Sequence, residues 1–535
     1  MTRTDAFRAA IKNIAVFSDS DVYPFPFERH TFHDDPANAV KSLREMDRRF
    51  KTELSQLPPT NIDSLAPVGY TSFRWTTQID PLWNAYYLAM VIELGAQIEA
   101  ARIPVSEKSV FSYRFVGPQP DGRLYDETQG WRAFMAECRE QADSYSHVVT
   151  CDISDFYERI YHHRVENALK WLDAPGNAPN RIVRILESFS GTVSYGLPVG
   201  GPASRLLAEL ALNGVDHLLR GNGVKFCRFV DDYRLFCRSR NEAYQRLIFL
   251  SERLSNEGLS LQKNKTRIIS SREFKSEIKA LLREPEEGEA LATDEARLLQ
   301  LSIRFDPYSD TRVEDYEILR NEVAKIDIAG ILSRELEKSR IDVAVTKQAI
   351  AAIRVLGERE RLVVLTSVLS PDNLHILGPV FPRLMTVLRG MYEELNKTCQ
   401  ELVEDRLVRF ASSDSYLLKL DLNLSYLIQV LRHRSTQEKE ALFMRLYAER
   451  PSPLVRKEII LAMADWRNRP WLSDLKRNFP GMSSWERRAF IVASYYLTDE
   501  GAHWRRYNDA TFSRSERLVR DWFSNRFATN QTVPW

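Results

Sequence analysis

Hydrophobic and polar positions divide the chain into a mixed first part and a helical second part. The segment His147–Ile153 is apolar and β-branched, which predicts a buried strand, and Phe156–Leu172 then follows a helical pattern. Such strands and helices alternate through the first part, which is typical of a mixed α/β domain. In the second part, apolar residues recur at helical spacing. One predicted helical face, for example, collects Ala349, Ile350, Ile353 and Leu356.

These patterns predict four segments. Residues 1–66 mix prolines with aromatic and acidic residues, which predicts an irregular N-terminal extension that packs on the rest of the protein. Residues 67–282 contain the mixed α/β pattern. Residues 283–300 are acidic and rich in turn formers, so we expect a linker or exposed loop there. Residues 301–535 form the predicted helical domain.

Two stretches near the C-terminus look like copies of one unit. The segment Arg456–Ala462 (RKEIILA) aligns with Arg487–Ala493 (RRAFIVA), and each precedes a predicted second helix. Helical pairs that repeat in this way predict a short solenoid similar to HEAT repeats. An irregular helical bundle fits the same pattern.

Composition narrows the class of protein. The chain has 535 residues, of which 44% are hydrophobic and 27% charged, so it is long enough for two or three globular domains. Lysine and arginine (74) nearly balance aspartate and glutamate (73), so a nucleic-acid contact requires a local basic surface. Five cysteines without metal-type spacing argue against a disulfide framework and a zinc site. With neither a secretory leader nor a long apolar run, we expect a cytoplasmic protein without a membrane anchor.

Acidic residues at two strand ends carry the candidate chemistry. The segment Lys225–Cys237 (KFCRFVDDYRLFC) predicts a hairpin with Asp231 and Asp232 at its turn, and Asp152 follows another apolar strand. Adjacent acids alone also fit a solvated turn. Carboxylates from separate strands, however, are what two-metal phosphoryl transfer needs to hold ions about 3.5–4 Å apart. We predict Asp152 and Asp231 as ligands of Mg²⁺, with Mn²⁺ as a substitute.

Four segments then resemble motifs A to D of reverse transcriptases, in the order of that family. They are DISDFYERIYHHR at Asp152–Arg164, GLPVGGPASRLLAEL at Gly196–Leu210, FVDD at Phe229–Asp232 and GLSLQKNKT at Gly258–Thr266. The resemblance covers roughly residues 70 to 270. In detail the chain resembles the abortive-infection reverse transcriptases of bacterial phage defence, in their prophage-borne branch. This resemblance implies an α+β/α architecture, in which fingers and palm precede an all-α HEAT-like domain.

The resemblance also implies roles for single residues. Asp152 and Asp231 match the metal ligands, and Asp232 matches the supporting acid of the turn. Lys265 matches the motif D lysine, which neutralises or protonates pyrophosphate. Tyr157 matches the aromatic gate that crowds a ribose 2′-hydroxyl, which implies a preference for deoxynucleotides, although a core aromatic would fit this position too.

Further matched residues border the incoming nucleotide. The motif B loop that lies beside the nucleotide and template matches at Gly196, Pro198, Gly200 and Ser204. Arg114 is the candidate for the fingers residue that grips the triphosphate, with an ordinary surface arginine as the alternative. Phe229 stands where the family more often has tyrosine.

The implied activity is magnesium-dependent polymerisation of deoxynucleoside triphosphates in phage defence by abortive infection. Relatives of this kind synthesise single-stranded DNA without a template, start on a tyrosine of the protein and form closed homo-oligomers. Tyr23 and Tyr70 are the priming candidates. The sequence does not identify a phage component.

Two other functions fit the same residues. One is an RNA-templated reverse transcriptase similar to those of retrons or group II introns, although the chain has no Val-Thr-Gly signature after the palm. The other is an interaction scaffold, in which the helical domain binds a partner and the palm only senses nucleotides. The intact acids Asp152, Asp231 and Asp232 argue against a degenerate site.

Overall fold

The chain divides into two compact units, which the sequence does not separate at a single point. A computed structural model describes residues 1–172, 176–191, 193–282, 294–300, 323, 325–530 and 532–533. The first unit comprises Met1–Asn61 and Thr77–Leu282, and the second comprises Ile62–Thr76 and Arg283–Trp535. The predicted boundary near residue 66 therefore differs from the structure, because a short segment of the first half belongs to the second unit.

The N-terminal segment is helical, so the prediction of an irregular extension is wrong. Its helices are α1 (Arg3–Phe17), α2 (Glu28–Asp34), α3 (Pro36–Arg48) and α4 (Phe50–Gln56). Proline does not break α3, because Pro36 occupies the first turn, where a backbone N–H has no helical partner, and Asp35 caps that turn. Helix α1 packs on α5 (Pro81–Ala101), a buried apolar helix of the same unit.

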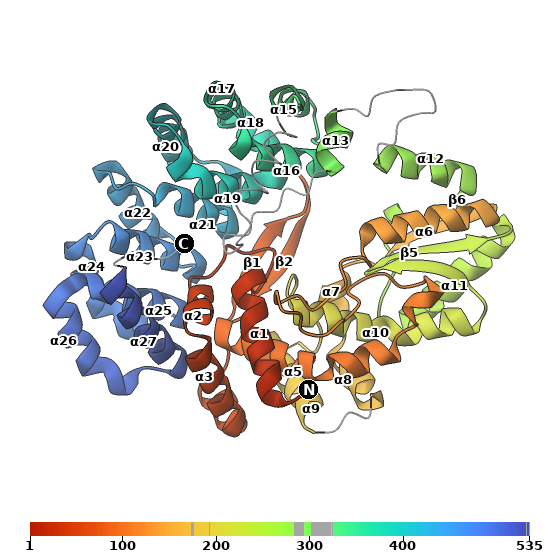
Figure 1. Ribbon diagram of the computed structural model, residues 1–535, viewed down its shortest axis with the longest axis horizontal. Helices are drawn as coiled ribbons and strands as arrows, with labels where there is room; N and C mark the ends of the chain where they lie inside the picture. Colours follow the sequence, from red (N-terminus) through yellow and green to blue (C-terminus); the bar gives the residue numbers. More distant parts are fainter. Residues whose placement is uncertain are drawn as a thin grey trace. The chain divides into compact units, whose positions relative to one another are not determined.

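The first unit contains a four-stranded antiparallel sheet, which lies on the right-hand side of Figure 1. Its strands are, in spatial order, β4 (Lys225–Phe229), β5 (Asp232–Cys237), β3 (His147–Asp152) and β6 (Arg267–Ser270). The register places Asp152 opposite Asp232. The predicted strand and the predicted acidic hairpin are both present, and they are neighbours.

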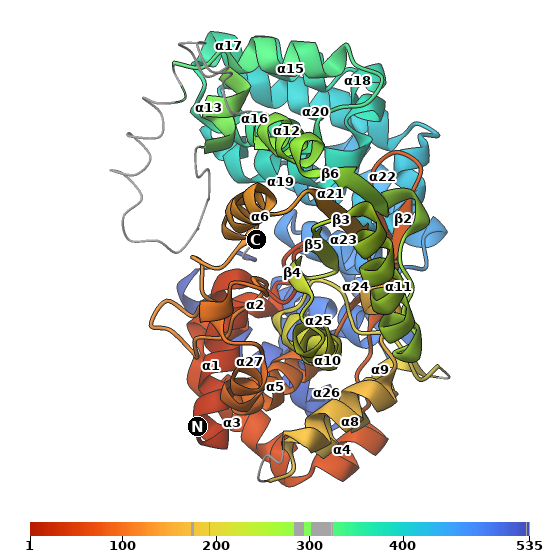
Figure 2. The same ribbon diagram turned by 90° about the vertical axis from the view of Figure 1, so that its right-hand side faces the viewer.

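Helices cover both faces of this sheet, as Figure 2 shows for α6 and α11. One face carries α6 (Trp131–Ser144) and α12 (Ser271–Leu282), which enclose a core that includes Phe134, Val148 and Phe236. The other face carries α10 (Pro202–Gly221) and α11 (Arg240–Asn256). All five cysteines are buried and free.

Three shorter helices complete the first unit. The predicted helix Phe156–Leu172 is divided at Ile160 and Tyr161, which are extended. The resulting helices are α7 (Phe156–Arg159) and α8 (His162–Trp171), followed by α9 (Ala178–Ser190). No helix among the described residues is long and apolar enough to span a membrane.

The second unit consists of a series of helices and of a two-stranded hairpin that comes from the first half of the chain. The hairpin is formed by β1 (Ile62–Pro67) and β2 (Phe73–Gln78), and β1 packs on α21 (Asp421–Leu431). The α-helices follow one another along an arc in Figure 1. They are α13 (Asp294–Gln300), α15 (Ile328–Leu336), α16 (Val343–Ala352), α17 (Glu358–Val368), α18 (Pro371–Ile376), α19 (Phe381–Met391), α20 (Lys397–Ala411), α21, α22 (Gln437–Glu449), α23 (Pro453–Asp465), α24 (Arg469–Leu475), α25 (Ser484–Ala493), α26 (Thr498–Asn508) and α27 (Arg514–Thr529).

From residue 294 onward, the described residues confirm the prediction of an all-helical C-terminal region. The two similar stretches, RKEIILA and RRAFIVA, lie in α23 and α25, which pack on each other. Their resemblance to HEAT repeats stays a prediction. Of the predicted linker, residues 294–300 form α13, and residues 283–293 lie outside the described residues.

Candidate active site

The acidic hairpin has a two-residue turn with an unusual backbone. Phe229 pairs with Asp232 across the hairpin, so Val230 and Asp231 form the turn itself. Val230 has a φ of 58°, which is in the left-handed region. A β-branched residue is rarely found there, and such a conformation persists only where its surroundings hold it. The neighbouring contacts therefore decide where Asp231 points.

Both backbone groups of Val230 are held by buried side chains. The Val230 N–H donates to Ser112 Oγ (2.9 Å), and the Val230 carbonyl accepts from Arg228 Nη1 (2.8 Å). The Arg228 side chain is fully buried and forms ion pairs with Glu209 (2.9 Å) and Asp216 (2.5 Å). An arginine paired in this way cannot move without leaving two carboxylates uncompensated.

Further contacts connect this network to the segment that follows α5. Arg102 Nη2 donates to Glu209 Oε2, and Ser112 Oγ donates to Glu209 Oε1, both at 2.6 Å. Burial alone would raise the pKa of Glu209, but the charges of Arg228 and Arg102 outweigh it and the pKa is lowered. We call the set Arg102, Glu209, Asp216 and Arg228 the buried ion cluster.

The sequence analysis missed the buried ion cluster, although a signal was present. Glu209 lies directly between Ala208 and Leu210, on a helix whose buried residues include Leu206 and Leu207. A charged residue among such buried residues requires a partner of opposite charge. Arg228, within the equally apolar strand β4, meets that requirement.

Three carboxylates meet at one end of the sheet. Asp152 ends β3 directly opposite Asp232, and the N–H of Ile153 donates to the Asp231 carbonyl (3.1 Å). Burial and then the charge of Asp152 raise the pKa of Asp231 to about 6. Burial also raises the pKa of Asp232, while Arg234 at 3.4 Å acts in the opposite direction. The structure thus brings together the three acids that the sequence predicted.

Lys265 reaches the same group from another element. Its Nζ donates to Asp152 Oδ2 (2.9 Å), and the N–H of Gln262 donates to the Asp152 carbonyl (2.8 Å). The hydrogen bond to Asp152 raises the pKa of Lys265. The lysine side chain is 65% exposed, so it can leave Asp152 when another anion arrives. This agrees with the position that motif D implies.

The residues fit a magnesium site that is completed by substrate. Within the residues that the structure describes, no group of three or more His, Cys, Asp and Glu side chains is arranged to hold a metal ion. Mg²⁺, however, usually keeps several waters and binds through one or two carboxylates plus substrate phosphates. Asp152 and Asp231 supply two such carboxylates, and the negative charge of Asp152 adds to the effect of burial in raising the pKa of Asp231.

The motif B loop lies beside Tyr157. The N–H groups of Gly196 and Leu197 donate to the carbonyls of Ile160 and Tyr157, both at 2.8 Å. His162, buried on α8, also donates through Nε2 to the Gly196 carbonyl (2.9 Å). Burial raises the pKa of Tyr157, and Asp231 is among the charges that act on this ring. The aromatic residue, the loop and the acid therefore share one neighbourhood.

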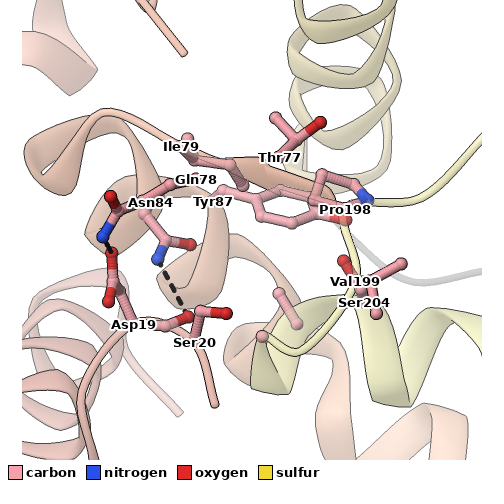
Figure 3. A pocket seen from close by; sticks show the side chains of 12 residues that line it. Asp19, Ser20, Thr77, Gln78, Ile79, Asn84, Tyr87, Pro198, Val199 and Ser204 are labelled. Carbon is pink, nitrogen blue, oxygen red and sulfur yellow. Dashed lines mark hydrogen bonds between the residues drawn. The ribbon is translucent and has the colours of Figure 1, made fainter. Parts of the chain in front are cut away.

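The N-terminal segment packs on the other side of this loop. A Cβ atom at Gly200 would come within 2.4 Å of Asp21 Oδ1 and 2.7 Å of Ser20 Oγ, and Gly200 has a φ of 95°. Asp19 accepts hydrogen bonds from Gln78 (3.1 Å) and Asn84 (3.4 Å), as Figure 3 shows. The remaining cavity is about 10 Å³ and also borders Pro198 and Ser204. A larger residue at position 200 would have to displace Asp21 and Ser20 and would strain the backbone.

The three remaining predicted residues have surroundings of other kinds. Arg114 is buried, with its guanidinium on Glu99 (2.5 Å) and the Ile103 carbonyl (3.0 Å). Tyr23 is 1% exposed. The Tyr70 hydroxyl belongs to the second unit, where it donates to the Ile376 carbonyl (2.6 Å) and accepts from the Ile341 N–H (3.2 Å). Their roles stay predictions.

Comparison with known families identifies the part of the chain that contains this site. Residues 96–293 match the model of the reverse transcriptase (RNA-dependent DNA polymerase) family. The chain contains a reverse transcriptase domain. The carboxylates, Tyr157, the motif B loop and Lys265 all lie within it. A domain of this family is a nucleotidyltransferase of the nucleic-acid polymerase class, so the predicted enzyme class is confirmed.

Similar solved structures are distant from this protein. Telomerase from Candida albicans, in complex with the TWJ fragment of telomeric RNA, is 11% identical over 78% of this chain and 64% of that chain, with a TM-score of 0.32. Apo telomerase from Candida tropicalis is 9% identical over 75% and 65%, with a TM-score of 0.31. The chain thus spans less than two thirds of either telomerase. No curated protein matches the sequence.

Proposed function

We propose that this protein is a DNA polymerase of reverse-transcriptase type that acts in phage defence by abortive infection and needs no template. The observation that carries the polymerase function is the meeting of Asp152, Asp231 and Asp232 at one end of the sheet, with Lys265 bonded to Asp152. The resemblance of the four motifs to the abortive-infection reverse transcriptases supports the role in phage defence.

Each residue of the site has a role in this reaction. Asp152 and Asp231 would hold Mg²⁺, which activates the attacking hydroxyl and stabilises the leaving pyrophosphate when it is bound. Asp232, opposite Asp152, keeps the site anionic. Lys265 would exchange its bond to Asp152 for the pyrophosphate, because the exposed ammonium can reach an arriving anion. Tyr157 would face the sugar and exclude a 2′-hydroxyl.

Synthesis without a template is supported by the N-terminal segment. In the family that the motifs resemble, the motif B loop borders both nucleotide and template. Here Ser20 and Asp21 pack directly on Gly200 of that loop. Chain that occupies this surface leaves less room for a second strand beside the nucleotide.

Removal of one predicted metal ligand tests the catalytic assignment. Purified protein with Mg²⁺ and deoxynucleoside triphosphates should make DNA. Asp231→Asn should reduce the rate of synthesis by at least about 100-fold, because a neutral amide binds Mg²⁺ much more weakly than a carboxylate does. Asp143→Asn is the matched control, since Asp143 is an exposed surface partner of Lys275. Equal rates for Asp231→Asn and the wild type would contradict the proposal.

RNA-templated synthesis is the second candidate, because the matching family is described as an RNA-dependent DNA polymerase. The two candidate functions differ in whether DNA synthesis requires RNA and in what sets the sequence of the product. A template-independent enzyme should extend in nuclease-treated preparations, and its product should follow the nucleotides supplied. Product that appears only after RNA is added, with a complementary sequence, would favour the second candidate.

Priming by the protein itself is also part of the proposal, with Tyr23 and Tyr70 as candidates. Both side chains are engaged in the structure, so priming from either requires local opening. Protease digestion and mass spectrometry of the product would identify an attached residue. Product that stays attached to both Tyr23→Phe and Tyr70→Phe would exclude these two positions.

The biological role and the assembly are tested separately. Cells with the intact protein should resist phage, and Asp152→Ala should abolish resistance if polymerisation is the cause. Retained resistance in that variant would favour the interaction scaffold. Native mass spectrometry of the purified protein tests the proposed homo-oligomer, and a monomer at micromolar concentration would contradict it.

A further inference from the structure

Arg205 is a cation of the active-site neighbourhood within the motif B segment, and the resemblance assigns it no role. It lies in the first turn of α10, and its side chain is 25% exposed. The guanidinium carbon is 5.1 Å from the centre of the Tyr113 ring. Its charge acts on Tyr113 and Tyr157, and the charge of Asp231 acts on the same two rings. Arg205 and the predicted metal ligand Asp231 therefore both lie near enough to these rings for their charges to act on them.

The only carboxylate paired with Arg205 among the described residues comes from the N-terminal segment. Asp21 Oδ2 accepts a hydrogen bond from Arg205 Nη2 at 2.6 Å, and Asp21 is 62% exposed. The segment is anchored next to this contact, because Asp19 is bonded to Gln78 and Asp21 itself lies against Gly200. The Asp21 carboxylate is thus held at the guanidinium while its own outer face remains in solvent.

An exposed carboxylate on a partly buried arginine resembles a site for an exchangeable anion. Because the Asp21 side chain is 62% exposed, solvent screens its attraction to Arg205, and the pair opens at a lower cost than a fully buried ion pair would. A phosphate group offers an arginine the same oxygen chemistry with more negative charge, and it can accept two parallel hydrogen bonds. Such a group can therefore replace Asp21 without rearrangement of α10.

We propose that Arg205 binds a phosphate group during nucleotidyl transfer, and that Asp21 occupies this position until the phosphate displaces it. This inference rests on the proposed polymerase function. The phosphate belongs either to the incoming deoxynucleotide or to the growing strand, both of which carry it close to the metal ligands. Arg114, the residue first predicted to grip the triphosphate, is buried against Glu99 and does not compete for this role.

Equilibrium binding separates this proposal from the catalytic one, because it requires no turnover. The probes are a non-hydrolysable α,β-methylene dATP with Mg²⁺ and a 5′-phosphorylated oligo(dT), each titrated onto the full-length protein. The variants are Asp21→Asn, Arg205→Gln and Arg205→Lys. Asp5→Asn serves as the matched control, because Asp5 is an exposed N-terminal aspartate paired only locally with Thr2 and Arg8.

Loss of the competing carboxylate should tighten binding. We expect Asp21→Asn to lower the Kd of one probe by about threefold or more, and Asp5→Asn to leave it unchanged. Arg205→Gln should raise the same Kd by about tenfold or more, with Arg205→Lys between the two, because lysine keeps the charge but not the paired hydrogen bonds. In the double variant Asp21→Asn/Arg205→Gln, the gain from Asp21→Asn should vanish.

The probe that responds identifies the source of the phosphate. A change confined to the dATP analogue assigns Arg205 to the triphosphate, and a change confined to oligo(dT) assigns it to the strand. Unchanged binding of both probes in Arg205→Gln, in protein with the circular dichroism of the wild type, would overturn the inference. DNA synthesis by the same preparations is measured in parallel, so that a failure of the proposed polymerase is recognised independently.

Discussion

We expect Tyr157 to determine the preference for deoxyribonucleotides over ribonucleotides. Its carbonyl accepts from the motif B loop, and its ring lies within the field of Asp231. Tyr157→Ala should open space for a 2′-hydroxyl and lower the preference for dATP over ATP by about 10- to 100-fold. Tyr157→Phe should preserve the preference, because the ring remains. The measurement is kcat/KM for both nucleotides, and an unchanged ratio in Tyr157→Ala would assign the ring to packing alone.

Gly200 should contribute to the stability of the protein, because its backbone conformation and its close neighbours both favour glycine. Gly200→Ala should destabilise the protein through its positive φ, at about 1 kcal/mol, and through the contact with Asp21 and Ser20, at about 1 kcal/mol or more. Gly223→Ala isolates the first contribution, because Gly223 has a φ of 65° and open space around it. Denaturant unfolding should rank Gly200→Ala as the less stable variant. Equal stabilities would mean that the N-terminal segment moves aside freely.

At the scale of elements, the buried ion cluster ties the acidic turn to α10. Arg228→Met should lower the free energy of unfolding by about 3–5 kcal/mol, because it leaves Glu209 and Asp216 buried without their cation. Arg267→Met is the control. It removes an exposed pair with Glu277, so we expect a loss of about 1 kcal/mol or less. Urea unfolding measures the free energy of unfolding of both variants. Similar losses in Arg228→Met and Arg267→Met would contradict the expectation that the buried ion pairs matter more than the exposed one.

The elements themselves were predicted unevenly from the sequence. Strand β3 and the β4–β5 hairpin have strong local signals, an apolar run and a turn between two apolar runs, and both were recognised. The N-terminal helices were missed because their prolines and aromatics suggest loops when tertiary contacts are ignored. The break between α7 and α8 was missed for a related reason, since Ile160 and Tyr161 fit a helical pattern. There the Gly196 N–H bonds the Ile160 carbonyl instead.

At the scale of the whole molecule, the β1–β2 hairpin belongs to the second unit although it lies within the sequence of the first. This predicts how a fragment of the first unit behaves when it is expressed alone. Ile62 and Ala66 are buried where β1 packs on α21, and the other face of the hairpin exposes Phe73 and Trp75. A fragment of residues 1–282 would keep the hairpin without α21, so we expect it to aggregate. Replacement of residues 62–76 by a short Gly-Ser linker should restore a monomer in size-exclusion chromatography. A monomeric fragment with its hairpin intact would contradict this reasoning.

The sequence by itself determined the type of domain and its three acids, because strand ends, turns and glycine-rich loops are local patterns that survive without knowledge of the fold. The family match over residues 96–293 confirms that domain. Only the tertiary structure decided what surrounds the acids. The pairs Arg228–Asp216, Asp21–Arg205 and Arg114–Glu99 each join residues of different elements or loops. Such partners depend on how elements pack, and no local pattern encodes them.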